Sequence, residues 1–183
     1  MGLVIEDGIG TGYTAIVDAT NLLGVRAVIE TELVEASEMG DSYSWSNVSY
    51  DYAAADTILL VQNTSTTQTM HIDFMYIQGS TATEVVIHCP TIAFVPTGTA
   101  VTGTNMNRTS GKTAVAIAKA NETQNTQGAV IFRGAIAAAP SDPYVIAMGG
   151  ALTLGYGQSV GVDFVTDGSA ARVTIIGHFS RVT

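Results

Sequence analysis

The sequence predicts an all-β protein: an antiparallel β-sandwich of jelly-roll or Greek-key type with an N-terminal β-hairpin or arm. Hydrophobic residues make up 46% of the 183 residues and charged residues only 13%, so we expect a single domain with a substantial core. Short segments with β-type alternation follow one another along the chain, roughly eight to ten in number, as in known sandwiches. No fixed-period repeat of the solenoid or propeller type is present.

Residues 1–40 are expected to form an arm or hairpin that docks on another protein, followed by the sandwich domain over residues 41–183. A strand is expected near residues 13–17, a turn at 18–21 and a longer strand from Val25 onward. Apolar side chains of such an arm could bind a neighbour's open sheet edge, with backbone hydrogen bonds supporting the contact. The candidate contact residues are Leu3, Ile5, Ile9, Tyr13, Leu22 and Leu23.

Aromatic residues cluster at the start of the expected sandwich, in the segment YSWSNVSYDY. Rings at this density suit an exposed platform that stacks on a glycan or contacts a partner, since each combines a large contact area with a polar group. The alternative is that the rings close one end of the sandwich core. The residues concerned are Tyr43, Trp45, Tyr50 and Tyr52.

The middle of the chain predicts consecutive strands at residues 57–63, 70–78 and 83–89. The first is apolar on both faces, which is typical of a central strand. Pro90 ends the third, because proline has no N–H to donate to a sheet ladder. Short connections predict that the three strands pair in order as a meander. The expected faces of the second strand are Met70, Ile72, Phe74 and Tyr76 on one side, and His71, Asp73, Met75 and Ile77 on the other.

The next region is less regular. Residues 96–112 are polar and Gly-rich, and they predict an exposed loop or an extended crossover. Residues 113–120 and 134–139 carry short β-like runs, although their alanines also allow helical turns. A further β-like run covers residues 144–157.

The C-terminal region shows the clearest hairpin pattern. Residues 159–165 and 171–179 each alternate apolar side chains on one face. The dipeptide Asp167-Gly168 between them favours a tight turn. We therefore expect these two strands to pair in one sheet. Their apolar faces are Val160, Val162 and Phe164, and Val173, Ile175 and Phe179.

Charge is distributed unevenly along the chain. The net charge is −9, and residues 1–90 hold twelve acids against Arg26 alone, whereas the remainder holds four acids and six bases. This balance disfavours nucleic-acid binding, which needs a basic surface. It serves solubility, or it places an acidic half against a basic partner or the basic half of a neighbouring copy. We expect no membrane span, because no apolar run approaches about 20 residues, and no signal peptide, because acids occur near the N-terminus.

Residues suited to catalysis or metal binding are few, and we expect no catalytic site, cofactor or metal. His71 and Asp73 could share a metal on one strand face, but no third or fourth ligand is apparent. His88 and Cys89 point to opposite faces of a strand, which argues against a nucleophilic pair. His178 is expected at the surface or an interface. The single cysteine forms no internal disulfide, and we expect it to be a small buried apolar group.

Several segments together resemble structural proteins of tailed bacteriophage particles, most closely the head decoration or cement proteins. They are IEDGIGTGYTAIVDATNLLGVRAV, YDYAAADTILLVQNTS, TEVVIHC and FVPTGTAVTGTNMNR. The resemblance implies a non-enzymatic virion protein, made in the host cytoplasm, that binds the capsid surface. It also implies the major capsid protein as partner, and a homotrimer of jelly-roll or sandwich subunits. No functional residue is carried over by motif.

Two other functions remain open at this level. One is a carbohydrate-binding β-sandwich of a phage tail or head appendage, which would use the aromatic residues to stack on a glycan. The other is a hydrolase on a jelly-roll scaffold, for which the sequence shows no recognisable acid pair or metal cluster.

Overall fold

A computed structural model of the chain describes residues 31–48, 50–53, 56–90, 95–123, 127–138, 142–166 and 168–181. Thr31–Thr183 form one compact unit. Residues 32–39, which the sequence assigned to the arm, are a helix within this unit. The predicted hairpin over residues 13–30 lies outside the described residues, as do its candidate contacts Leu3, Ile5, Ile9, Tyr13, Leu22 and Leu23.

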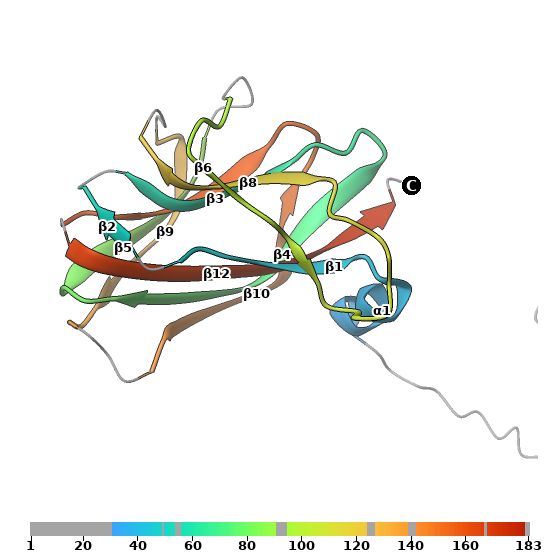
Figure 1. The fold of residues 1–183 in the computed structure, drawn as a ribbon, viewed down its shortest axis with the longest axis horizontal. Coiled ribbons are helices and arrows are strands. Elements are labelled where there is room, and N and C mark those ends of the chain that lie inside the picture. The colour runs from blue at the N-terminus through green and yellow to red at the C-terminus, as the bar shows by residue number, and fades with distance from the viewer. Residues whose placement is uncertain are drawn as a thin grey trace, which may run out of the picture. The chain divides into compact units, whose positions relative to one another are not determined.

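The described chain contains one short helix and twelve strands (Figure 1). No helix among these residues has the length and apolar character needed to cross a membrane. In chain order the elements are α1 (Glu32–Met39), β1 (Ser42–Ser46), β2 (Tyr50–Tyr52), β3 (Thr57–Asn63), β4 (Gln68–Gly79), β5 (Thr83–Cys89), β6 (Thr99–Val101), β7 (Thr104–Asn105), β8 (Ala116–Glu122), β9 (Ala129–Ile136), β10 (Tyr144–Leu154), β11 (Ser159–Phe164) and β12 (Gly168–Arg181).

The strands form two antiparallel sheets packed face to face, which confirms the predicted sandwich. One sheet has the order β10-β4-β12-β1-β7, with β2 also paired to β12, and the other has the order β6-β8-β3-β11-β5-β9. Eight of these strands give the two four-stranded orders β1-β12-β4-β10 and β3-β11-β5-β9. This arrangement is that of a jelly roll, an eight-stranded fold of two packed sheets.

The predicted strand pairings were wrong, although strands occur where the meander and the C-terminal hairpin were predicted. β3 pairs with β8 and β11 rather than with β4, and β12 pairs with β1, β2 and β4 rather than with β11. Neither the meander nor the C-terminal hairpin is therefore formed. Alternation identifies which face of a strand is buried. It does not identify the partner strand, because after a short connection the chain can return within one sheet or cross to the opposite sheet, and the same face is buried in both cases. In the segments with alternative helical interpretations, residues 116–120 belong to β8 and residues 134–136 to β9.

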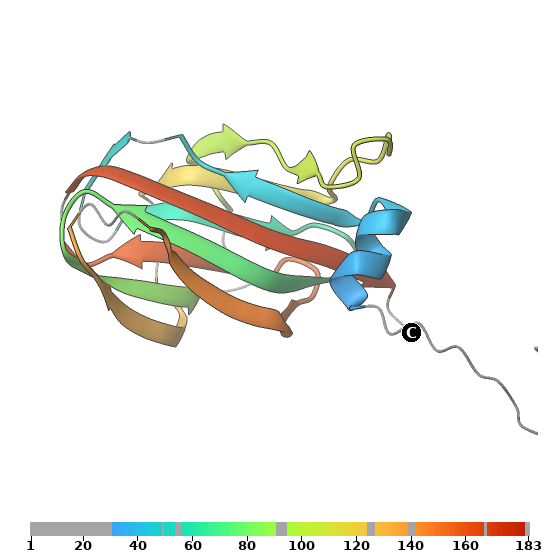
Figure 2. The ribbon, with the colours of Figure 1, turned by 90° about the horizontal axis from the view of Figure 1, so that it is seen from below.

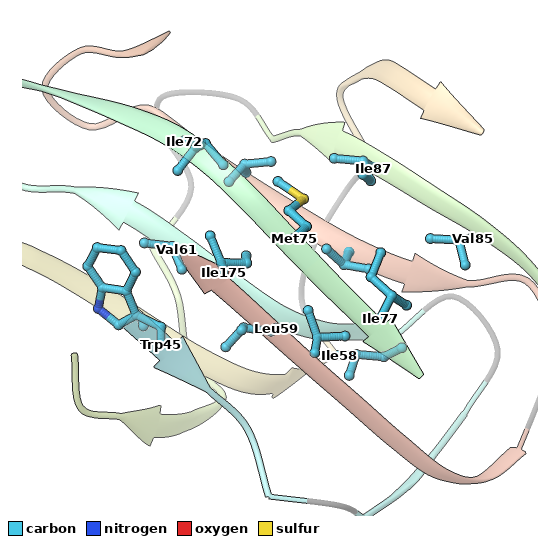
Figure 3. Close-up of a cluster of buried hydrophobic side chains, with 14 of the residues drawn as sticks. Trp45, Ile58, Leu59, Val61, Ile72, Met75, Ile77, Val85, Ile87 and Ile175 are labelled. Atoms are coloured by element: carbon cyan, nitrogen blue, oxygen red, sulfur yellow. The ribbon is translucent and has the colours of Figure 1, made fainter. Parts of the chain in front are cut away.

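The core lies between the two sheets. Figure 3 shows side chains from both, including Leu59, Val61 and Ile87 from one sheet and Ile72 and Ile175 from the other. These residues are fully buried. Burying a side chain of this size contributes about 1.5–3 kcal/mol relative to leaving it exposed. The interior between the two sheets is therefore the main hydrophobic core of the described residues.

A β-bulge at Asp73 changes the predicted faces of β4. Ile176 on β12 is opposite Phe74, and the next residue, Gly177, is opposite Ile72, so Asp73 is the additional residue on its strand. As a result Met70 and Ile72 face the core before the bulge, whereas Met75 and Ile77 face it afterwards. Phe74 and Tyr76 lie on the opposite face and are only partly buried. Bulges of this kind redirect side chains and are common beside functional sites.

The two sides of the sandwich differ. On one side, the segment between β5 and β9 adds β7 to the edge of β1 and adds β8 and β6 to the edge of β3. On the other side, β9 and β10 end their sheets, and no other described strand pairs with their outer edges. Figure 2 shows the first side along the top, in yellow-green, and orange β10 along the bottom. One side of the jelly roll is therefore extended and the other is open.

Candidate functional site

The open side of the sandwich, formed by β9 and β10, is an apolar surface with little charge. Arg133 is the only charged residue in β9, and its guanidinium binds the Glu84 carboxylate at 2.7 Å. β10 contains no charged residue. Natural sheet edges in monomers usually carry charges or prolines that prevent pairing with another chain. The exposed large apolar residues of these two strands are Val130, Ile131, Tyr144 and Val145.

Side chains that face the core are incompletely covered on this open side. Phe132 on β9 and Ile146, Met148 and Leu152 on β10 pack against the core but remain partly exposed. The Phe132 and Tyr144 rings are 6.3 Å apart and join the two sheets at this edge. The core therefore extends to the surface between β9 and β10. Exposed apolar patches on folded proteins commonly mark interaction sites.

The aromatic platform predicted from the sequence is not formed by Tyr43 and Trp45, which are 2% and 0% exposed. The Tyr43 ring lies 6.0 Å from Trp45 and makes an edge contact with Phe179 at 5.8 Å. Serines alternate with these two rings along β1, so the aromatic face is the one that enters the core. This pattern in the sequence supported the alternative, that the rings close the core. Tyr50 and Tyr52 lie on β2, and their side chains fall outside the description.

Helix α1 lies at one end of the sheet that contains β1 and β12. Its N-cap is Thr31, whose hydroxyl accepts from Val34 N–H at 3.3 Å, and its C-cap is Gly40, with φ of 75°. Glycine adopts this left-handed conformation without strain. Ala36 is buried, and the Ser37 hydroxyl is 2.6 Å from that of Ser42 on β1. The helix therefore covers the outer face of the sheet at this end.

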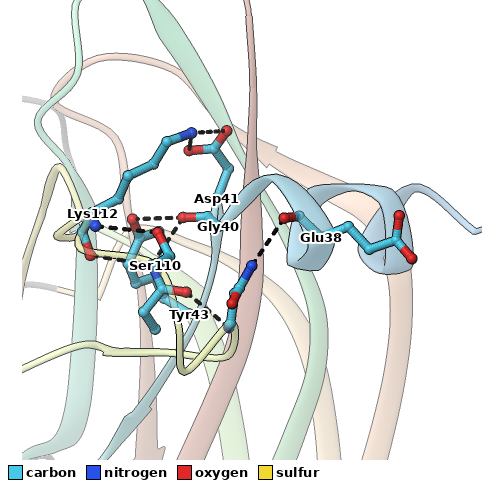
Figure 4. A network of polar contacts seen from close by, with 8 residues as sticks. Glu38, Gly40, Asp41, Tyr43, Ser110 and Lys112 are labelled. Carbon is cyan, nitrogen blue, oxygen red and sulfur yellow. Dashed lines mark hydrogen bonds and ion pairs between the residues drawn. The ribbon is translucent and has the colours of Figure 1, made fainter.

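Polar contacts hold the loop after β7 against the helix end (Figure 4). Asn105 donates its side-chain amide to Gly40 O at 2.9 Å and to Lys112 O at 3.1 Å. The Lys112 ammonium lies 2.9 Å from both oxygens of Asp41. Tyr43 donates its hydroxyl to Gly40 O at 3.2 Å. Burial, and to a lesser degree the Asp41 charge, raise the pKa of Tyr43, so this hydroxyl keeps the proton that it donates.

A cavity of about 1120 Å³ lies beside this network, between α1, residues 111–115 and the ends of β4 and β12. This volume is comparable to that of small-molecule sites, which are usually about 300–1,000 Å³. The polar side chains that line it include Glu32, Glu35, His71, Lys112, His178 and Ser180.

The sequence predicted His178 at the surface or an interface, but the residue is 2% exposed and lies beneath α1. Its Nδ1 lies 2.8 Å from Oδ2 of Asp73, which is itself buried. Glu32 Oε2, at the N-terminus of the helix, is 3.8 Å from His178 Nε2. The bulge at Asp73 and the register of β12 bring these side chains together. Asp73 and His178 are far apart in the sequence, so the sequence did not predict this pair.

His71 lies next to His178 on the neighbouring strand, with the two rings stacked at 4.9 Å. His71 Nδ1 donates to Gly150 O at 3.2 Å, because a carbonyl oxygen only accepts, and its Nε2 is 2.8 Å from the Ser180 hydroxyl. His71 and Asp73 thus have separate protein partners. The described residues contain no group of three or more histidine, cysteine or acidic side chains that could hold a metal.

A second buried pair of a histidine and an aspartate lies in the other sheet. His88 Nε2 is 2.9 Å from Asp163 Oδ1, and Gln127 donates to the other oxygen of Asp163 at 2.6 Å. His88 and Asp163 are almost completely buried, and neither lines the cavity near α1. The adjacent Cys89 is half-buried, and desolvation raises its thiol pKa. We interpret this pair as part of the packing of the sheet.

No protein-family model, curated protein or solved structure matches the chain. The described residues offer two candidate sites, the open edge at β9 and β10 and the polar cavity beside α1.

Proposed function

We propose that the chain is a non-enzymatic structural protein of a tailed-bacteriophage particle, which binds the outside of the capsid as a decoration protein and associates into a trimer. The observation that carries this proposal is the open, nearly uncharged side of the jelly roll at β9 and β10. A protein of this class gains free energy by burying surface against sister copies and shell subunits. Specific interfaces typically bury about 1,200–2,000 Å².

Fold and sequence support the same class of protein. Jelly rolls occur in viral capsid and lectin domains. The segments that resemble phage decoration proteins include residues 50–65, which contain β3, and residues 83–89, which form β5. The glycan-binding alternative relies on exposed rings, and the burial of Tyr43 and Trp45 removes two of its four candidates.

In this proposal the N-terminal residues contact the shell, and β9 and β10 contact sister copies. The compact unit begins at Thr31, and each strand of the jelly roll follows that residue. Removing residues 1–24 therefore deletes no strand of the described sandwich. The two contacts can be tested separately because they use different parts of the chain.

The test combines light scattering of the purified protein with co-sedimentation on undecorated phage heads. We expect a trimer that sediments with the heads, and a variant lacking residues 1–24 that remains a folded trimer but stays in the supernatant. Full-strength binding by that variant would overturn the role of the arm. A monomer that does not bind heads would overturn the proposed function, and a glycan array would then test the carbohydrate alternative.

A further inference from the structure

The His178 side chain has a buried nitrogen without a hydrogen-bond partner. Asp73 accepts the Nδ1–H hydrogen bond at 2.8 Å, which assigns the proton of the neutral ring to Nδ1 and leaves a lone pair on Nε2. Nε2 has no hydrogen-bond partner among the described residues, although the residue is only 2% exposed. Buried polar atoms of this kind are rare in folded proteins, and each requires an explanation.

The atom that lies near Nε2 is also an acceptor. Glu32 Oε2 is 3.8 Å from it, and two acceptors cannot bond to each other. A single donor placed between them could reach both at ordinary hydrogen-bond lengths of about 2.7–3.2 Å. Gly150 borders this space, since a Cβ atom there would lie 3.7 Å from His178 Cε1 and 3.9 Å from Glu32 Oε2. The Glu32 side chain is 83% exposed, so the position can be reached from solvent.

Charge around the cavity favours a cationic donor. Glu32, Glu35 and Asp41 line it together with one cation, Lys112, and that ammonium is already paired with Asp41. An anion would be repelled by the two glutamates. The described residues offer no set of three ligands for a metal ion. The ligand must carry positive charge to suit the acidic cavity, and it must donate hydrogen bonds to the two acceptors. A guanidinium or ammonium group does both, because it carries positive charge and several N–H donors.

We propose that the cavity beside α1 binds the cationic head of an arginine or lysine side chain, which donates hydrogen bonds to His178 Nε2 and to the Glu32 carboxylate. Two sources share this chemistry. One is Arg26 of a neighbouring copy, the only lysine or arginine among residues 1–90. The other is a basic side chain of a different protein. The site is distinct from the open edge at β9 and β10, so it does not depend on the proposed function.

The test follows the three histidine rings of the full-length protein by ¹⁵N NMR. The free protein should show His178 as the neutral Nδ1–H tautomer. The probe is N-acetyl-arginine amide, and N-acetyl-citrulline amide is its uncharged control of similar shape. We expect the arginine probe to shift His178 Nε2 saturably and to bind about tenfold more tightly than the citrulline probe, since charge-assisted hydrogen bonds are the stronger ones.

Two variants of the same helix supply the protein controls. Glu32→Gln should weaken arginine binding about tenfold. Glu38→Gln removes the same charge from α1 at a residue outside the cavity lining, and it should change the affinity by less than about twofold, as expected of an exposed charge. An equal effect of the two variants would overturn the proposal, because it would indicate a non-specific electrostatic attraction.

The variant Arg26→Gln distinguishes the sources. If Arg26 of a neighbouring copy occupies the cavity, the free variant will show a different His178 Nε2 shift and a higher affinity for the probe. An unchanged spectrum and affinity assign the ligand to another protein. The proposal fails if His178 responds to the arginine probe in neither the wild type nor the Arg26→Gln variant. It also fails if the His178 ring is doubly protonated in the free protein at neutral pH, because Nε2–H would then bond to Glu32 without a ligand.

Discussion

Asp73 and His178 form a buried hydrogen-bonded pair at 2.8 Å although they are 105 residues apart in the sequence. The Asp73 position is not a regular continuation of an alternating strand. Asp73 is the additional residue of a bulge in β4, and the adjacent register of β12 places His178 opposite His71. The pair therefore exists only because of an irregularity in the sheet, and it joins β4 to β12 directly beneath α1.

Replacing Asp73 should destabilise the fold. Asp73→Ala leaves the His178 Nδ1–H without its acceptor in a buried position, and an unsatisfied buried donor costs about 1–3 kcal/mol. Asp73→Asn should cost less, since its side-chain carbonyl can still accept. Urea unfolding at one fixed protein concentration measures both losses. Glu35→Ala, on the nearby helix, is the exposed control, and an Asp73→Ala loss no larger than that of this control would contradict the structural role of the pair.

A larger residue at Gly161 should destabilise the fold. A Cβ atom at this position would lie 2.8 Å from Thr57 Cγ2 and 2.9 Å from His88 Nε2, both of which are buried. Overpacking of this kind typically costs about 1–3 kcal/mol. We expect Gly161→Ala to lower the free energy of unfolding by an amount in that range. Gly111→Ala is the matched control, because no atom lies within 4 Å of its added Cβ. Equal stability of the two variants would show that the sheet can relax around residue 161.

Cys89 should react slowly with thiol reagents in the folded protein. Desolvation raises its pKa, so at a given pH the folded chain holds less of the reactive thiolate than the unfolded chain does. The protonated thiol therefore favours the folded state below the unfolded pKa, and this contribution is lost as the pH rises through the folded pKa. Alkylation rates measured against pH, with and without urea, test this. A folded midpoint at or below the unfolded one would contradict it.

The sequence predicted strand positions and buried faces better than it predicted strand partners. Thr57–Asn63 and Thr83–Cys89 were predicted with the bounds that the structure shows, because Pro90 and the apolar runs act locally. Pairing is a long-range property, and β3 joins β8 and β11 rather than its neighbour in the chain. The length of a short connection does not indicate whether the chain returns within one sheet or crosses to the opposite sheet.

The polar cavity could not be predicted for a related reason. His178 and Asp73 come together through a bulge that strict alternation conceals, and Glu32 comes from a helix that lay within the predicted arm. The burial of Tyr43 and Trp45 could have been predicted from the sequence, because serines occupy the other face of β1.

A lysine on the open edge should prevent self-association without unfolding the protein. Val145 on β10 and Val165 after β11 are 49% and 48% exposed, so Val145→Lys and Val165→Lys make the same change at equal exposure. Only Val145 belongs to the uncharged edge, where an ammonium would have to be desolvated on association. We expect Val145→Lys to lower the mass measured by light scattering to that of a monomer, while its circular dichroism and Tm stay close to those of Val165→Lys. A trimer that persists in Val145→Lys would show that the copies associate through another surface.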